Sequence, residues 1–327
     1  MITFRKVLLM LLLITLISAS FVYIAGAQAL APSDELYVGI YAFTDLEYWV
    51  DHKLGLEAAG KMLGVKTKFV GPPGHDMIAI VTDFEQAIAE NAAGIVVFGT
   101  EESLAPVINK AMDAGILVVT VDADVASSNR VTFVGTDPYN AGYLGGTKMA
   151  EVLGGKGKVA ILTDLGNTSL VHRVAGYQAA LADKAPDVEI VQVGDTKGDT
   201  INALQVANAI LQRNPDLTGI ACVEAAGGAA AATAIEEAGL VGKVKIITMD
   251  RDQQVLEKII SGTIEGTLVQ KSALMPFYAV QIMYGMRHAA IAITSDNKAA
   301  GIIAAPNPID TGVTYVDKST AEYYIRH

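Results

Sequence analysis

Two apolar runs of the chain each end in a pair of aspartates, Asp122 with Asp124 and Asp250 with Asp252. A carboxylate can accept hydrogen bonds from two neighbouring hydroxyls, and such charge-assisted bonds are strong where water is excluded. The local alternative is that these aspartates cap helices or close turns. We expect Asp122 and Asp250 to contact a ligand, together with Asp124.

Adjacent aromatic residues follow the first apolar run. They are Tyr48 and Trp49, and Trp49 is the only tryptophan of the chain. An aromatic face packs well against the C–H face of a sugar ring and excludes water from the contact. The alternative is that both side chains cap a helix and fill the core. We expect them to project into a binding cleft.

Three further polar residues could contact a ligand, two at the ends of apolar runs and one in a helical pattern. Glu224 follows the run that begins at Gly219, Gln270 ends a later run, and Arg173 lies in a helical pattern. An arginine offers five donors in a fixed fork, which suits ring and hydroxyl oxygens. The alternatives are a solvated glutamate, a glutamine bonded to backbone and a surface ion pair. Because carboxylates outnumber cations here, the set favours a neutral polyol or an amine over an anion.

Short β-branched runs alternate with amphipathic stretches from Leu36 onward, which is typical of βαβ units and a parallel sheet. Helices are expected at 50–63, 202–212 and 276–288. In open parallel sheets, ligands bind at the carboxyl ends of the strands, where the candidate residues lie. The expected strands are 36–43, 65–71, 94–99, 116–121, 131–135, 158–163, 188–193, 219–223, 244–249 and 263–270.

The order of these elements recurs after roughly 120 to 130 residues, so that Gly55 corresponds to Gly176 and Asp122 to Asp250. The sequence therefore predicts an α/β protein of two doubly wound parallel-sheet lobes joined by a hinge of several crossings. The expected N-terminal lobe comprises 34–136 plus 271–306, and the C-terminal lobe 137–270 plus 307–327.

Bulk composition agrees with two globular domains, since 327 residues exceed one ordinary core and 51% are hydrophobic. The formal net charge is −11, and no stretch gathers Lys and Arg as a nucleic-acid partner would require. Cys222 is the single cysteine, which excludes a disulfide within the chain and a cysteine-based zinc site. We expect neither a metal nor a cofactor.

The first 29 residues resemble a signal peptide. Arg5 and Lys6 precede an apolar run over 7–17, and Ala27 and Ala29 give the small-x-small pattern of a cleavage site. We expect cleavage after 1–29 and a periplasmic or extracellular location. The alternative is a retained membrane anchor.

Motifs of catalysis are missing from the sequence. It contains no Gly-x-Ser-x-Gly elbow, Walker loop or His-Glu-x-x-His, and the glycines at 154–157 precede a strand where a phosphate loop would follow one. Paired carboxylates could hydrolyse a glycoside, which is the main enzymatic alternative. A transcriptional regulator would need an N-terminal helix-turn-helix, where the export signal stands. We expect a protein that is not an enzyme.

Nearly the whole chain after the signal resembles the type I periplasmic sugar-binding proteins, most closely the bacterial glucose-binding proteins of the ribose-binding group. The matching pieces are Tyr48-Trp49, Pro106 within 105–111, 119–124, 134–137 with 141–143, 154–159 and 309–313.

The resemblance implies ligand contact by Trp49, Asp122, Arg173, Asp250 and Gln270. It also implies three hinge crossings and delivery of a monosaccharide to the permease of an ABC importer, by a monomer that meets the membrane only through that transporter. A chemoreceptor-coupled role is the alternative. The chain departs from the family at 98–101 and at Glu224, so the resemblance predicts a sugar without specifying glucose.

Overall fold

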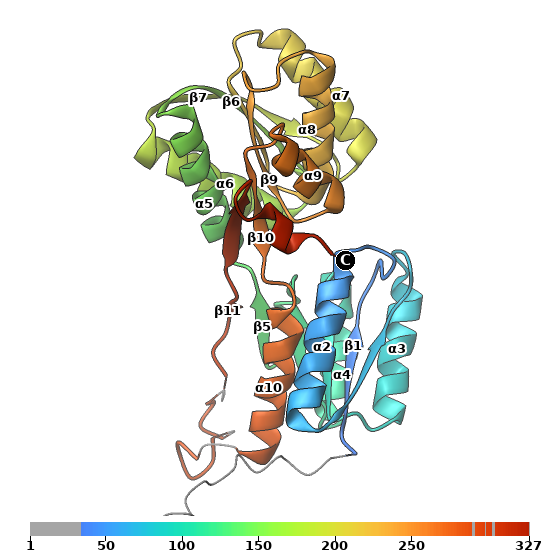
Figure 1. Cartoon of the computed structure of the whole chain (residues 1–327). Coiled ribbons are helices and arrows are strands. Elements are labelled where there is room, and N and C mark those ends of the chain that lie inside the picture. The colour runs from blue at the N-terminus through green and yellow to red at the C-terminus, as the bar shows by residue number, and fades with distance from the viewer. Residues whose placement is uncertain (1–33, 290–291, 298, 303–304, 327) are drawn as a thin grey trace, which may run out of the picture.

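The computed structural model describes residues 34–289, 292–297, 299–302 and 305–326, and the expected signal peptide 1–29 lies outside them. Two lobes lie end to end, each with a six-stranded sheet and helices on both faces (Figure 1). No helix of the described residues is long and apolar enough to span a bilayer. The fold class predicted from the sequence, two doubly wound α/β lobes, is confirmed.

The first sheet has the strand order β11-β5-β4-β3-β1-β2, and every pair in it is parallel. Its strands are β1 (Leu36–Ile40), β2 (Lys66–Val70), β3 (Gly94–Phe98), β4 (Leu117–Val121), β5 (Thr132–Gly135) and β11 (Ile309–Asp310). Its helices are α2 (Trp49–Leu63), α3 (Met77–Ala89), α4 (Ala105–Asp113) and α10 (Leu274–His288), with a short turn η1 (Glu102–Leu104).

The second sheet repeats this arrangement as β12-β10-β9-β8-β6-β7, except that β12 is antiparallel to β10. Its strands are β6 (Lys156–Thr163), β7 (Asp187–Asp195), β8 (Gly219–Cys222), β9 (Lys245–Met249), β10 (Gly266–Gln270) and β12 (Val313–Asp317). Its helices are α5 (Pro138–Leu153), α6 (Thr168–Lys184), α7 (Thr200–Arg213), α8 (Ala225–Glu237) and α9 (Gln253–Ser261), with a short turn η2 (Ala321–Tyr324).

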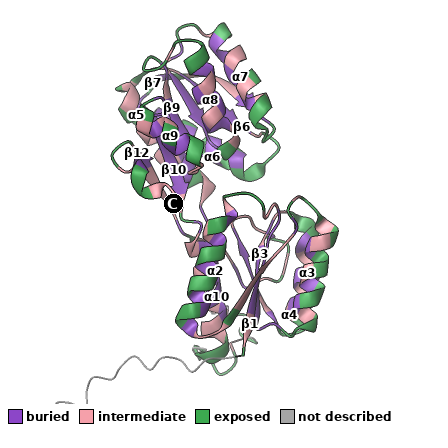
Figure 2. Ribbon diagram, turned by 45° about the vertical axis from the view of Figure 1, so that its right-hand side comes forward, coloured by how far each residue is buried: buried purple, intermediate pink, exposed green. Residues whose placement is uncertain are grey.

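The central strands form because they are short, β-branched and apolar on both faces. Strand β3 reads GIVVF and is buried except at its last residue. Such strands become central in a parallel sheet because helices cover both faces. In Figure 2 the buried strands of both lobes lie between helices whose outer faces are exposed.

Helix starts follow ordinary capping chemistry. The carboxylates of Asp76 and Asp199 accept hydrogen bonds from the backbone amides of Ala79 and Asn202, in the first turns of α3 and α7. Asn167 does the same at the start of α6, through the amides of Ser169 and Leu170. Each cap satisfies an amide that a helix start leaves unpaired.

The chain crosses between the lobes three times, between β5 and α5, between β10 and α10, and between β11 and β12. Helix α10 returns to the first lobe and packs on α2 and β4, as the sequence predicted. One expected boundary needs correction. Residues 307–327 were assigned wholly to the second lobe, but β11 pairs with β5 of the first sheet, so the last crossing lies after Asp310.

Glycines at equivalent positions of the two lobes permit close packing where the chain crosses. A Cβ at Gly55 of α2 would lie 1.9 Å from the carbonyl oxygen of Ala273, just before α10. A Cβ at Gly176 of α6 would lie 2.0 Å from the carbonyl oxygen of Tyr139 in α5. In both lobes, the helix after the first strand therefore packs directly against the segment that arrives from the other lobe.

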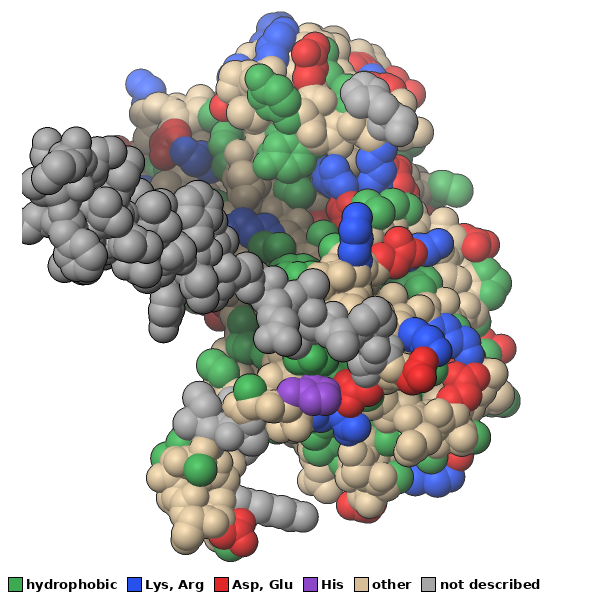
Figure 3. Space-filling view, turned by 60° about the horizontal axis from the view of Figure 1, so that its bottom comes forward, with side chains coloured by type: hydrophobic (Ala, Val, Ile, Leu, Met, Phe, Trp, Pro, Cys, Tyr) green, Lys and Arg blue, Asp and Glu red, His purple; other side chains and the backbone are tan. Residues whose placement is uncertain are grey.

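Charges of both signs are interspersed on the protein surface. Figure 3 shows Lys and Arg side chains beside Asp and Glu on the uncovered part of the face that it presents. The protein surface also carries ion pairs, such as Lys68 with Glu90 and Lys110 with Glu85. No broad patch of Lys and Arg gathers on that face, as binding to a phosphate backbone would require.

Candidate functional site

A cavity of about 410 Å³ lies between the lobes, at the carboxyl ends of both sets of strands. The first lobe lines it with Leu46, Tyr48, Phe98, Asp122, Ala123 and Thr136. The second lobe lines it with Asn167, Ser169, Leu170, Arg173, Glu224, Ala225, Asp250, Asp252 and Gln270. Six of the eight residues predicted as ligand contacts are therefore brought together: Tyr48, Asp122, Arg173, Glu224, Asp250 and Gln270.

Asp122 and Asp250 hold equivalent places in the two lobes. Each directly follows a buried strand, β4 or β9, and each has a positive φ, 66° and 67°. The amide of Asp122 donates to the carbonyl of Val134, and that of Asp250 donates to the carbonyl of Leu268. Aspartate adopts this left-handed conformation more readily than bulkier residues do. The same bend therefore turns one carboxylate from each lobe toward the shared cavity.

In the first lobe, Asp122 is paired with Tyr48. The Tyr48 hydroxyl donates a hydrogen bond of 2.5 Å to Oδ1 of Asp122. Burial raises the pKa of Asp122, although the Tyr48 hydrogen bond and the charge of Arg173 oppose this effect. Burial also raises the pKa of Tyr48 well above its ordinary value, so Tyr48 acts as a donor. One carboxylate oxygen is held by the tyrosine, which orients the group toward the cleft.

In the second lobe, Asp250 is paired with Gln270 at the end of β10. The amide Nε2 of Gln270 donates to Oδ1 of Asp250 over 3.1 Å. Burial raises the pKa of Asp250 to about 6, while the charge of Arg173 and the Gln270 hydrogen bond oppose the rise. A carboxylate with this pKa takes up a proton in mildly acidic solution, where an ordinary aspartate stays ionised.

Among the described residues, Arg173 is the one cation that lines the cavity, and it is 7% exposed. Its Nη1 donates to the carbonyl of Val223 over 2.7 Å, and its Nε is buried without a partner. Burial lowers the pKa of Arg173, whereas the charges of Asp250 and Asp122 raise it. An arginine remains protonated in such a setting. It therefore supplies the site with positive charge and with donors for a ligand oxygen.

Glu224 is 8% exposed and accepts a hydrogen bond from the hydroxyl of Thr196. Burial raises the pKa of Glu224, and the hydrogen bond from Thr196 opposes the rise. With Asp122, Asp250 and Asp252 it gives the cavity four carboxylates against one guanidinium. An anionic ligand would meet repulsion from this lining, whereas hydroxyl groups would find acceptors.

Trp49, predicted to stack on a ligand, lies outside the cavity lining. Its side chain is 4% exposed and packs against Tyr41, His52 and Phe98 at ring-centroid distances of 5.1, 4.8 and 4.8 Å. It is the first residue of α2, and the helix directs it into the core of the first lobe. The aromatic surface in the cavity comes from Tyr48 and Phe98 instead.

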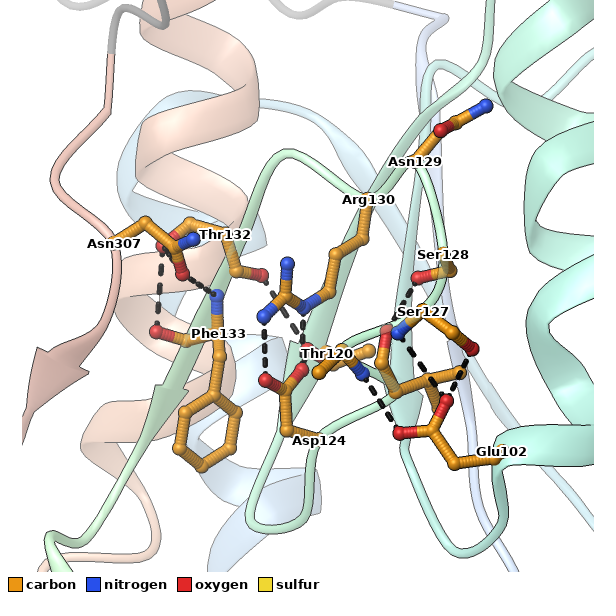
Figure 4. A network of polar contacts seen from close by, with 12 residues as sticks. Glu102, Thr120, Asp124, Ser127, Ser128, Asn129, Arg130, Thr132, Phe133 and Asn307 are labelled. Atoms are coloured by element: carbon orange, nitrogen blue, oxygen red, sulfur yellow. Dashed lines mark hydrogen bonds and ion pairs between the residues drawn. The ribbon is translucent and has the colours of Figure 1, made fainter.

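Asp124, predicted as a further ligand contact, also lies outside the lining. Both of its oxygens bind Arg130, and Oδ1 accepts from Thr120 over 2.7 Å (Figure 4). In Figure 4 this pair lies among polar contacts that tie the loop after β4 to Thr120 of β4 and to Glu102 of η1. Its hydrogen bonds stabilise the local loop, which is the turn-closing role given above as the alternative for these aspartates.

Five polar or aromatic lining residues were not among the predicted contacts: Phe98, Thr136, Asn167, Ser169 and Asp252. Phe98 ends β3 and Thr136 directly follows β5, so the rule that functional residues follow strand ends would have found both. Asn167 and Ser169 lie at the start of α6, where their capping role conceals them. Within the described part of the chain, no group of three His, Cys, Asp or Glu could hold a metal ion.

Comparison with known proteins identifies the family of this chain. Residues 38–290 match the periplasmic binding protein domain. The D-allose-binding periplasmic protein of Escherichia coli is 30% identical over 237 residues, which cover 69% of this chain and 76% of that protein.

Solved structures agree with this match. The arabinose-binding protein AraP of Geobacillus stearothermophilus superposes with a TM-score of 0.84 at 32% identity, covering 90% of this chain and 100% of that chain. An ABC transporter solute-binding protein of Burkholderia graminis in complex with D-arabinose gives a TM-score of 0.76 at 28% identity, covering 90% and 99%. The two-lobe fold is shared with these proteins.

Proposed function

The chain belongs to the family of periplasmic binding proteins, and from this we propose that it captures a monosaccharide between its lobes and delivers it to an ABC importer. The observation that carries the proposal is that Asp122 and Asp250, from different lobes, line one cavity. A ligand that bridges them has contacts that neither lobe can offer alone. Binding therefore shifts the population toward the closed form.

The lining has the chemistry that a neutral sugar requires. Asp122 and Asp250 accept from neighbouring hydroxyls, Arg173 donates to a ring or hydroxyl oxygen, and Gln270 and Asn167 add amide groups. Phe98 and Tyr48 offer aromatic surface to the C–H groups of the ring. We propose these residues, together with Glu224, as the ligand contacts. Trp49 and Asp124 would not touch the ligand; Trp49 would stabilise the core of the first lobe and Asp124 the loop after β4.

The family consists of solute-binding proteins, and the role we propose includes no catalysis. After cleavage of 1–29, the chain would act outside the cytoplasmic membrane as a monomer. Its partners would be the permease subunits of the importer, reached in the closed form. The sugar-binding relatives and the signal-like N-terminal sequence support this location.

A thermal-shift screen of the purified protein against pentoses, hexoses and their polyols tests the proposal. A ligand that binds only the folded state raises the free energy of unfolding by mass action, by about 2.7 kcal/mol when its concentration is a hundred times its Kd. The melting temperature rises accordingly. We expect at least one neutral monosaccharide to do this, with calorimetry confirming one site per chain. A protein that responds to anionic solutes or to no sugar in the panel would refute the assignment.

A further inference from the structure

A second group of charged residues joins the lobes beside the ligand cavity. The carboxylate of Asp51 on α2 receives two hydrogen bonds from Arg251, at 2.5 Å from Nη2 and 3.1 Å from Nε. Arg326 brings a second guanidinium to the same carboxylate. Its Nη2 lies 3.0 Å from Oδ2 of Asp51, and its Nη1 binds Glu47. One carboxylate therefore holds two arginines.

The two arginines belong to the other lobe. Arg251 follows β9, and Nη1 of this residue also donates to the carbonyl of Tyr324 over 3.0 Å. Arg326 follows η2, which packs on α9, while Tyr324 and Ile325 pack on the core of the second lobe. In Figure 1 the C-terminal end lies at the top of α2, between the two lobes. Each bond from Asp51 to an arginine thus crosses the interlobe gap.

These bonds are not those of freely solvated surface charges. The side chains of Asp51, Arg251 and Arg326 are 13%, 22% and 25% exposed. Burial alone would raise the pKa of Asp51, but the hydrogen bonds and charges of Arg251 and Arg326 hold it below its ordinary value. Isolated exposed pairs contribute little, whereas a two-pronged arginine contact within a network of partly buried charges is stronger and more directional.

The network is adjacent to the ligand site. Asp51 comes three residues after Tyr48 at the start of α2, and Arg251 directly follows Asp250. A small cavity of about 10 Å³ is lined by ligand-site residues and network residues together, including Tyr48, Asp250 and Gln270. Ser272, in the crossing between β10 and α10, also donates to Asp51 over 3.4 Å. These bonds therefore join the chain segments that carry Tyr48 and Asp250.

We propose that Asp51, Arg251 and Arg326 form an interlobe clamp that sets the angle between the lobes and so positions Tyr48 and Asp122 opposite Asp250 and Gln270. These three are positioning residues, since none of them lines the ligand cavity. Loss of the clamp widens the range of angles, so that fewer molecules present a complete site. The effect on affinity rests on the proposed function, but the effect on the lobe angle does not.

The test compares Asp51→Asn with a matched control, Glu85→Gln. Glu85 forms an exposed ion pair with Lys110 at 2.6 Å, and both of these residues lie in the first lobe. The asparagine side chain of Asp51→Asn keeps the shape of the aspartate and removes its charge.

The interlobe distance is measured by pulsed electron paramagnetic resonance between two spin labels. They are attached at Asp113→Cys on α4 and Glu237→Cys on α8, which are exposed helix ends in different lobes. Cys222 is 2% exposed and does not compete for label.

We expect a broader interlobe distance distribution in the unliganded Asp51→Asn protein, and an unchanged one in Glu85→Gln. Affinity for the sugar found by screening should fall about tenfold in Asp51→Asn, equal to about 1.4 kcal/mol. Added salt should weaken binding by the wild type more than by this variant, because the clamp is ionic. Arg326→Gln, which keeps the pair of Asp51 with Arg251, should show a smaller change in the same direction.

A distance distribution that is identical in wild type and Asp51→Asn would overturn the clamp. If Asp51→Asn does not fold, the distribution of Arg326→Gln decides the question in the same way. If the wild type binds no sugar, the proposed function fails, whereas the distance measurement still decides on the clamp. Unchanged affinity in a variant with a broadened distribution would refute the positioning role.

Discussion

Among single residues, Asp250 is the group on which the cleft has the clearest effect, since burial raises its pKa from 3.8 to about 6. A hydroxyl of the ligand donates best to the ionised form, so binding favours loss of this proton. We expect affinity for the sugar to be highest above pH 7 and to fall by about tenfold at pH 5. Calorimetry in buffers of different ionisation heat should show proton release near pH 6.

The unliganded protein responds to pH with the opposite sign. Because the folded-state pKa of Asp250 is raised, its contribution to folding stability is fully present below about pH 3.8 and is lost as pH rises through about 6. Asp250→Asn should remove most of the pH dependence of binding. An affinity that stays constant from pH 5 to pH 8 in the wild type would contradict the assigned role of this carboxylate.

Substitutions at two neighbouring aromatic residues should have different effects on sugar affinity and on folding stability. Tyr48→Phe removes the donor to Asp122 and leaves the ring, so we expect weaker sugar binding and a loss of stability of about 1 kcal/mol. Trp49→Ala removes a buried core side chain, so we expect a loss of stability of about 3 to 5 kcal/mol. Denaturant titration and calorimetry together measure both effects. Normal stability of Trp49→Ala with abolished binding would restore Trp49 as a direct contact.

The sequence allowed six of the cavity-lining residues to be predicted, because side chains that follow parallel strands meet at one edge of a sheet. Asp122, Asp250 and Gln270 were found in this way. Trp49 and Asp124 lie outside the lining because adjacency in sequence does not determine which side chain of a pair faces the cavity. Trp49 turns into the core at the helix start, and Asp124 is bound by Arg130.

At the scale of elements, the close contacts at Gly55 and Gly176 tie each lobe to the chain that enters it. Gly55→Ala would place a methyl group 1.9 Å from the carbonyl oxygen of Ala273, forcing α2 away from the start of α10. We expect a loss of about 1 to 3 kcal/mol, measured by denaturant unfolding. Gly285→Ala in α10 is the control, since nothing lies within 4 Å of its Cβ and helix propensity should add up to about 1 kcal/mol. Equal stability of the Gly55→Ala and Gly285→Ala proteins would refute this packing argument.

The main strands could be predicted because their runs are apolar on both faces, and all ten expected strands are present with ends shifted by a few residues. Strands β11 and β12 escaped prediction. The first has two residues, and only Val316 of the second is buried, so neither gives an apolar pattern. Their pairing depends on chain segments distant in sequence, which no local pattern records.

For the whole molecule, the two sheets share one strand order and turn the same edge toward one cavity. This duplication allows each lobe to contribute one carboxylate at the same backbone bend, Asp122 in the first and Asp250 in the second. A ligand that needs both carboxylates couples binding to the closure of the lobes. Neither lobe alone would then form a complete site.

The most direct test of this account measures sugar affinity by calorimetry for Asp122→Asn, Asp250→Asn and the double variant. Asparagine tolerates the positive φ at both positions, so the backbone bend is retained while the charge is removed. Each single change should weaken binding by about 2 to 4 kcal/mol, because each removes a charge-assisted acceptor from a different lobe. If either variant binds the sugar as tightly as the wild type does, the ligand is not held between the two lobes by these carboxylates.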